Sequence, residues 1–209
     1  MKKQYWHFSN LDKKLGYGDG REIVAGKTLA VPGPIVLCEK GLHASERLID
    51  ALTYAPGAYV WAVELSGEVV HGNDKTCATK RKAIWGYDAT EVLRAFARRV
   101  ALDTVTKYWD EKSLGAFPLV SIDYLKTGKE SLRSAAGDAA WAARAGDAAW
   151  SAAWAAWSAA GDAAWSAAEA AAWSAAEAAA RYAAWAAARS AAEADYNQWL
   201  TEMILGGRP

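Results

Sequence analysis

Histidines and clustered cations are the residues of the N-terminal half whose chemistry could serve a binding or catalytic site. His7 lies in an aromatic run (YWHFS), His43 lies in the segment GLHAS, and His71 directly precedes a glycine. A histidine can act as an acid or a base because its side chain titrates near neutral pH. The apolar neighbours of His7 and His43 also favour a structural role for both, and we interpret His71 as a solvated turn residue.

A run of cations follows at Lys75, Lys80, Arg81 and Lys82. Lysine and arginine donate charge-assisted hydrogen bonds to phosphate, so this cluster could form a phosphate-binding edge. The alternative interpretation is a solvated loop. We predict ligand-binding roles for four residues of these two groups: His43, Lys75, Lys80 and Arg81.

Several common catalytic and metal-binding patterns are missing from the sequence. The glycine-rich segment Gly16–Gly20 has no Lys-Ser/Thr pair behind it, so it is not a P-loop. No pair of histidines has the spacing of metal ligands, and Cys38 and Cys77 lie far apart. We therefore expect no metal, no bound cofactor and two unpaired thiols in a reducing cytosol.

The composition excludes further classes of protein. The 209 residues carry 24 Lys+Arg against 24 Asp+Glu, so no strong net charge favours nucleic acid or anionic lipid. Two cysteines are too few for a disulfide scaffold. No run of about 20 strongly apolar residues could cross a membrane, and no apolar run follows the N-terminal lysines as it would in a signal peptide. We predict a cytoplasmic protein.

Residues 1–127 are expected to form a small mixed α/β domain. Breakers such as Pro32-Gly33-Pro34 divide short β-favouring runs, and Ser45 is a candidate N-cap for the helix that follows it. The expected strands are 4–8, 21–25, 27–31, 35–38, 58–65 and 68–70, the expected helices are 46–55 and 89–107, and a loop is expected at 115–121.

Residues 134–194 follow a different pattern, in which about every fourth residue is large or charged and the rest are Ala or Ser. Alanine is the best helix former, so this Ala/Trp segment is predicted to be helical. A four-residue step covers 400°, and the large side chains therefore drift about 40° per step around a single helix. Three GDAAW motifs favour short helices packed as hairpins; one long helix is the alternative.

Eight of the twelve tryptophans lie between Trp141 and Trp199 and need a covering surface. We predict that they pack in a scaffold or a homodimer interface, with Trp165, Trp173 and Trp185 at or near that interface. Residues 134–209 contain four Arg against eight Asp+Glu, a net charge of −4, which argues against nucleic acid. The predicted fold class is α+β, with an α/β domain at 1–127 and an Ala/Trp-rich helical region at 128–209.

Several motifs together resemble an uncharacterised family of bacteriophage and bacterial proteins. The motifs are GLHAS at 41–45, YAPG at 54–57, VELSGEVV at 63–70, and Asp74-Lys75 followed by Ala78-Thr79. Members of this family often end in Ala/Trp-rich repeats, and the resemblance covers nearly the whole chain. It implies a phage or mobile-element setting and an accessory role in host takeover.

A second resemblance is to ADP-ribosyltransferase-like domains, which hold NAD in a cleft between short sheets. A strand that ends in a small or hydroxyl residue, the helix with ALxYA at 51–55 and the following β-run carry this resemblance. It implies catalytic candidates at His7, at Ser45, and at Glu64 or Glu68.

Three hypotheses about function follow. The first is a non-catalytic, anti-defence binding protein that blocks a host defence protein or sequesters a nucleotide-like signal in the host cytoplasm. The second is an NAD-using ADP-ribosyltransferase-like enzyme. The third is a structural or oligomerisation component of a phage.

Overall fold

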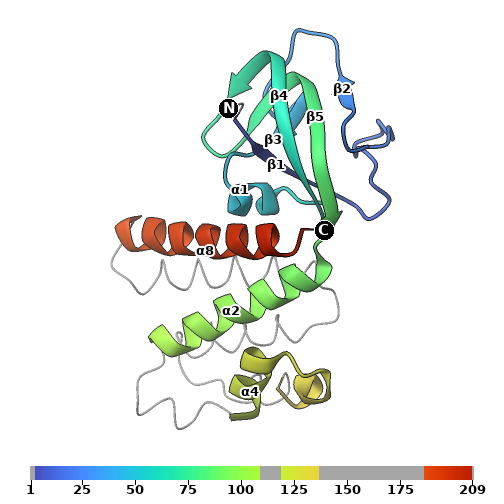
Figure 1. Ribbon diagram of the computed structural model, residues 1–209. Helices are drawn as coiled ribbons and strands as arrows, with labels where there is room; N and C mark the ends of the chain where they lie inside the picture. Colours follow the sequence, from blue (N-terminus) through green and yellow to red (C-terminus); the bar gives the residue numbers. More distant parts are fainter. Residues whose placement is uncertain (1–2, 109–118, 137–185, 209) are drawn as a thin grey trace. The chain divides into compact units, whose positions relative to one another are not determined.

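The computed structural model describes residues 3–108, 119–136 and 186–208. An antiparallel sheet occupies the N-terminal part and helices follow it, which confirms mixed α+β content (Figure 1). The chain divides into two compact units: Met1–Thr90 with Ile204–Pro209, and Glu91–Met203. The predicted domain boundary at residue 127 falls within the second of these spans and stays a prediction.

A long hairpin is the main element of the first unit. Strands β4 and β5 pair over most of their length, β1 pairs with the other edge of β4, and β2 and β3 share the other edge of β5. All of these pairings are antiparallel (Figure 1). The strands are β1 (Tyr5–Ser9), β2 (Thr28–Ala30), β3 (Leu42–Ala44), β4 (Tyr59–His71) and β5 (Thr76–Asp88).

One further pair of hydrogen bonds closes the sheet on itself. The backbone N–H of Trp6 donates to the carbonyl of Ser45 at 2.8 Å, and the N–H of Ser45 donates to the carbonyl of Trp6 at 2.9 Å. The path β1–β4–β5–β3 therefore returns to β1. Register shifts at Ala62/Val63 and Ser66/Val69 mark bulges, which bend and twist a hairpin. Side chains on the inner face of this closed sheet consequently converge.

The inner face carries an apolar cluster. Its buried members are Tyr5, Ile23, Ala44, Trp61, Val63 and Ala83. Tyr5 lies opposite Val63 and His7 lies opposite Trp61 across β1 and β4, so these four side chains share one face. The indole N–H of Trp61 donates to Ser9 Oγ at 3.0 Å, which satisfies the polar atom of a buried ring. The other face of β1 carries Phe8, and β1 is in contact with helix α1 (Leu48–Thr53).

Several predicted elements differ from those in the structure. Residues 35–38 form no strand: Ile35 is buried, but Val36 bridges Lys40 across a turn in which Cys38 has a φ of 72°. Ser45 caps no helix, because its backbone is bonded to Trp6 and α1 begins after Arg47. The cluster after Lys75 is no solvated loop, because β5 occupies residues 76–88.

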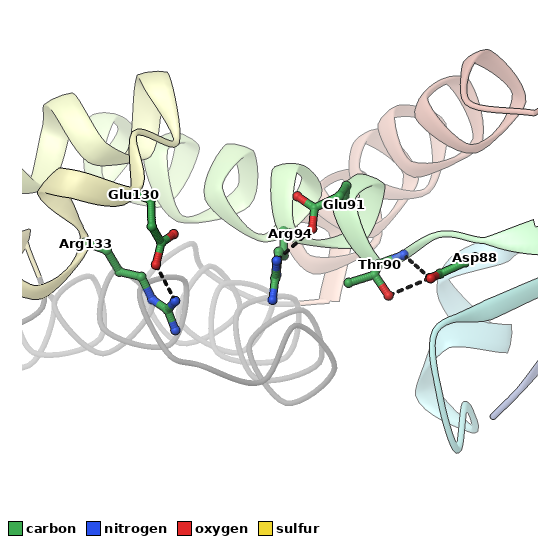
Figure 2. A network of polar contacts seen from close by, with 6 residues as sticks. All are labelled: Asp88, Thr90, Glu91, Arg94, Glu130 and Arg133. Atoms are coloured by element: carbon green, nitrogen blue, oxygen red, sulfur yellow. Dashed lines mark hydrogen bonds and ion pairs between the residues drawn. The ribbon is translucent and has the colours of Figure 1, made fainter. Parts of the chain in front are cut away.

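Helix α2 (Thr90–Tyr108) agrees closely with the predicted helix at 89–107. Figure 2 shows how it begins: Asp88 Oδ1 accepts a hydrogen bond from the Thr90 N–H at 2.9 Å and one from the Thr90 hydroxyl at 2.6 Å. This contact supplies an acceptor for a backbone N–H at the helix N-terminus. The same view shows the ion pairs Glu91–Arg94 and Glu130–Arg133, both 2.7 Å, in which the two glutamates and Arg94 are solvent-exposed and Arg133 is partly buried. Such pairs add little stability.

The second unit also contains α4 (Leu119–Thr127), the short η1 (Glu130–Leu132) and most of α8 (Ala186–Gly206). Aromatic contacts join α2 to α8. The guanidinium of Arg99 lies 4.1 Å from the ring centroid of Trp199, and the Tyr196 hydroxyl is 3.0 Å from Asp103 Oδ2. Among the described helices, none is long and apolar enough to span a membrane. Trp165, Trp173 and Trp185, with most of the Ala/Trp segment, lie outside the described residues.

Gly86 offers a direct test of the sheet's packing. A Cβ atom at this position would lie 2.6 Å from the Val60 carbonyl oxygen and would overlap the Trp61 ring. We expect Gly86→Ala to lower the free energy of unfolding by about 1–3 kcal/mol, because overpacking forces neighbouring atoms apart. Urea unfolding followed by tryptophan fluorescence measures this change.

The matched control is Gly16→Ala. No atom lies within 4 Å of a Cβ built at Gly16. We expect its stability to stay the same or to rise by up to about 1 kcal/mol. Equal urea midpoints for the two variants would contradict the packing described for Gly86.

Candidate functional site

Arg81 is a cation in the middle of the sheet. Its backbone lies opposite Leu65 of β4 and Leu29 of β2, and its side chain points to the inner face, where only 2% of the residue is exposed. Nη1 donates a hydrogen bond to the carbonyl oxygen of His43 on β3 at 2.5 Å. Within the described part of the chain, Nη2 is buried and has no hydrogen-bond partner. The guanidinium is therefore held at one nitrogen and unpaired at another.

This guanidinium remains charged at neutral pH. Burial, followed by the positive charge of Arg21, lowers the pKa of Arg81 to about 9, and the carboxylate of Asp19 opposes that shift. An arginine with this pKa still carries its proton at pH 7. Burying a charge without full pairing is costly, and an unsatisfied buried donor in a native protein calls for an explanation. An anion bound at Nη2 would supply the missing acceptor.

The carboxylate nearest to this charge is already engaged elsewhere. Asp19 accepts two hydrogen bonds from Arg21, Nε to Oδ1 at 2.6 Å and Nη2 to Oδ2 at 2.7 Å. Arg21 Nη1 also donates to the Ala30 carbonyl on β2 at 2.8 Å. The hydrogen bond from Arg21, more than the charge of Arg81, lowers the pKa of Asp19. The loop thus forms its own bidentate pair and leaves Arg81 without a partner carboxylate.

His43 is held as a neutral imidazole by the backbone. Its Nε2 accepts a hydrogen bond from the Cys38 N–H at 3.1 Å, and the ring makes a second hydrogen bond to the Gly41 backbone. Since Nε2 is the acceptor, Nδ1 carries the proton and donates to Gly41. Burial, with the charges of Lys75 and Arg81, lowers the pKa of His43. Both ring nitrogens are therefore used in shaping β3, whose carbonyl holds Arg81.

His7 lies next to this charge at the place where the sheet closes. Trp6, its neighbour, is bonded to Ser45, and Ser45 is two residues from the carbonyl that accepts from Arg81. Burial, then Arg81 and then His43, lower the pKa of His7 well below its ordinary value. His7 is partly exposed as a residue, whereas Arg81 is almost completely buried.

The other predicted ligand-binding residues lie away from Nη2. Lys80 precedes Arg81 on β5, so its side chain points to the opposite, exposed face. The ammonium of Lys75 lies 3.9 Å from the ring centroid of Tyr54. Although burial opposes the shift, hydrogen bonds to Cys38 and Tyr54 raise the pKa of Lys75. Lys75 acts on the site through its charge near His43.

The structure does not bring the three catalytic candidates together. Ser45 is buried, and its backbone joins β3 to β1. Glu64 follows Val63, which belongs to the inner cluster, so its side chain leaves the opposite face of β4 from the face of His7. Glu68 lies within the bulge between Ser66 and Val69 and is exposed. The catalytic assignment of His7, Ser45 and Glu64 stays a prediction.

Sequence reasoning identified His7, His43 and Arg81 individually but did not group them. It missed Asp19 and Arg21 of the glycine-rich loop, whose charges act on Arg81. The signal was present, because Asp and Arg two residues apart flank Gly20, and Gly20 has a φ of 67° that allows the loop to reverse tightly. Among the described residues, no three His, Cys, Asp or Glu side chains are grouped to hold a metal.

Comparison with known proteins yields one similarity. Residues 13–95 match a family described as a domain of unknown function (DUF7666). The matched span contains the loop, β2 to β5 and the start of α2, and thus includes Arg81 and His43 but not His7. No curated protein and no solved structure matches the chain.

Two histidines, His7 and His43, predict how stability depends on pH. Their pKa values are lowered in the folded protein, whereas in the unfolded chain they are near 6.5. Below about pH 6.5 the unfolded chain therefore binds more protons, and stability falls as pH falls. We expect the free energy of unfolding to drop between about pH 7 and pH 5.5, by at most about 1.4 kcal/mol per pH unit for each histidine.

Urea midpoints measured across this pH range test the expectation. In His7→Gln the pH dependence should weaken, since one of the two titrating groups is removed. A midpoint that rises on acidification would contradict the neutral state of these histidines.

Proposed function

We propose that the protein is a non-catalytic binding protein whose closed sheet takes the anionic group of a small, nucleotide-like molecule. The single observation that carries this proposal is the buried Nη2 atom of Arg81, which has no hydrogen-bond partner among the described residues. A phosphoryl oxygen accepts well from guanidinium N–H groups, and such charge-assisted hydrogen bonds are about twice as strong as neutral ones. The ligand would remove the cost of leaving that donor unpaired.

The surroundings of Arg81 favour binding over catalysis. A general acid or base needs a ring nitrogen free to exchange a proton with substrate. Both nitrogens of His43 are engaged by the backbone. Glu64, one of the two acidic candidates for an ADP-ribosyltransferase-like reaction, leaves the opposite face of β4 from His7, and the other, Glu68, is exposed within a bulge of β4. The enzyme hypothesis is therefore the second candidate.

The biological setting of the proposal comes from the sequence. The GLHAS, YAPG and VELSGEVV motifs resemble those of phage and bacterial proteins, which supports an accessory, anti-defence role in the host cytoplasm. In this role the protein would sequester a nucleotide-like signal, or block a host defence protein. The Ala/Trp segment would form helical repeats that brace the sheet domain or pair two copies. A purely structural phage component is the third candidate.

Anion-dependent stabilisation tests the proposed site. We expect phosphate, and more strongly a nucleotide, to raise the free energy of unfolding of the protein, by about 2.7 kcal/mol at a concentration one hundred times the Kd. Thermal unfolding with phosphate, with a panel of nucleoside phosphates and cyclic dinucleotides, and with chloride at equal ionic strength measures this effect.

Arg81→Met should abolish the stabilisation by phosphate, because it removes the charge and keeps an unbranched side chain of similar length. The matched control is Lys80→Met, which removes a positive charge one residue away on the opposite face and should respond to phosphate as the original protein does. Equal responses of the two variants would refute the site. A variant that fails to fold is replaced by Arg81→Lys, for which we expect weaker stabilisation because lysine cannot reproduce the guanidinium fork.

The proposed homodimer has its own test. Eight tryptophans need cover, and two-fold dimers are the commonest closed assembly. We expect light scattering at micromolar concentration to give the mass of a dimer, and Trp173→Ala, with Trp165 and Trp185 unchanged, to lower stability by about 3–5 kcal/mol if the ring is fully buried. A monomeric mass with blue-shifted tryptophan fluorescence would instead show that the segment packs within its own chain.

A further inference from the structure

We propose that the group bound at Arg81 is a phosphate monoester dianion, and that His7 takes up one proton from solvent when this dianion binds. This inference rests on the proposed function and specifies which anion the site accepts. It concerns a pair of residues, because the dianion would lie between the guanidinium of β5 and the imidazole of β1.

The closure of the sheet brings these two groups together. Arg81 reaches across the inner face to the His43 carbonyl on β3, and β3 is bonded to β1 through Ser45 and Trp6. His7 follows Trp6 on β1, and its side chain lies on the inner face opposite Trp61. The unpaired Nη2 and the His7 ring therefore lie at one junction, and His7 is the more exposed of the two residues.

Burial, followed by the groups at this junction, lowers the pKa of His7, so that His7 is neutral without a ligand. The titratable groups that act on it are the guanidinium of Arg81 from β5 and the imidazole of His43 from β3, and the Asp19–Arg21 pair of the loop contributes through Arg81. No carboxylate appears among the groups that act on His7. Adding a second positive charge next to a buried guanidinium is unfavourable in the free protein.

Binding of a dianion would instead make the protonated state of His7 favourable. Its two negative charges match one guanidinium and one imidazolium, and each cation donates an N–H to an oxygen of the ligand. The proton comes from solvent and joins a ring nitrogen of His7, and no covalent bond of the ligand changes. A carboxylate or phosphodiester carries one negative charge, which Arg81 alone would balance. Such a ligand would stabilise protonated His7 less than a dianion would.

Calorimetry with inorganic sulfate measures the proton uptake on binding directly. Sulfate is a tetrahedral dianion that does not titrate near neutral pH, so any proton taken up belongs to the protein. Titrations at one pH in buffers of different ionisation enthalpy give the number of protons, which we expect to approach one. Between the free and bound pKa values of His7, the affinity should fall as pH rises, by up to tenfold per pH unit.

Two histidine variants assign the proton to a residue. In His7→Gln we expect sulfate to bind more weakly, without proton uptake and without the pH dependence. His71→Gln is the matched control, because His71 is exposed at the end of β4, where its Nδ1 contacts Thr76 Oγ1. This control should take up the proton as the original protein does. NMR of the histidine ring protons should show the His7 signal titrating at higher pH in sulfate.

The outcomes separate this inference from the proposed function. Binding of sulfate and dimethyl phosphate with equal affinity and no proton uptake would overturn the role of His7 and leave the anion site intact. Proton uptake that persists in His7→Gln would also overturn it. No response to any anion in calorimetry or thermal unfolding would refute the site itself. Phosphate and phenyl phosphate, measured in the same way, should reproduce the sulfate result once their own ionisation is subtracted.

Discussion

A charged guanidinium buried inside a closed sheet is the feature on which the rest of the first unit depends. Arg81 is almost completely buried, yet one of its terminal nitrogens has no acceptor within the described residues. Few proteins leave a buried charge unpaired, because the cost of removing an ion from water is repaid only by good hydrogen bonds. The surrounding elements can be understood as the means of holding this charge in place without neutralising it.

Three features of the fold hold the charge of Arg81 in place. The backbone bridge between Trp6 and Ser45 closes the sheet, so that β3 can offer the His43 carbonyl to Nη1. The main chain at Cys38 and Gly41 fixes the His43 ring, which keeps that carbonyl in position and the ring neutral. The glycine-rich loop provides a carboxylate but binds it to Arg21 instead. Each of these contacts uses the backbone or a local pair, and none satisfies Nη2.

The sequence predicted the elements whose patterns are regular and missed those shaped by the buried charge. Helix α2 was found because its apolar residues recur at helical spacing, and β1 because its aromatic run is short and bounded. Strand β5 was missed because its inward-pointing residue between Lys80 and Lys82 is an arginine. The three residues therefore look like one cationic cluster, and the alternation of inward and outward side chains is hidden. Residues 35–38 looked like a buried strand, yet Cys38 adopts a left-handed conformation that ends any such extension. His43 and Arg81 could be named from their chemistry, whereas their contact depends on sheet closure, which no local pattern encodes.

The charges around Arg81 also bear on how selective the proposed anion site would be. Arg21 lies close enough to Arg81 to lower its pKa, and Lys75 acts on His43. In the free protein burial is the largest cause that lowers the pKa values of His7 and His43, and the positive charge of Arg81 adds to it. A ligand that brings negative charge would pair with the guanidinium of Arg81, while a neutral ligand of the same shape would leave that charge uncompensated. Because the free protein already bears the cost of the unpaired Nη2, the proposed discrimination between anionic and neutral molecules would follow from the electrostatics of the free protein.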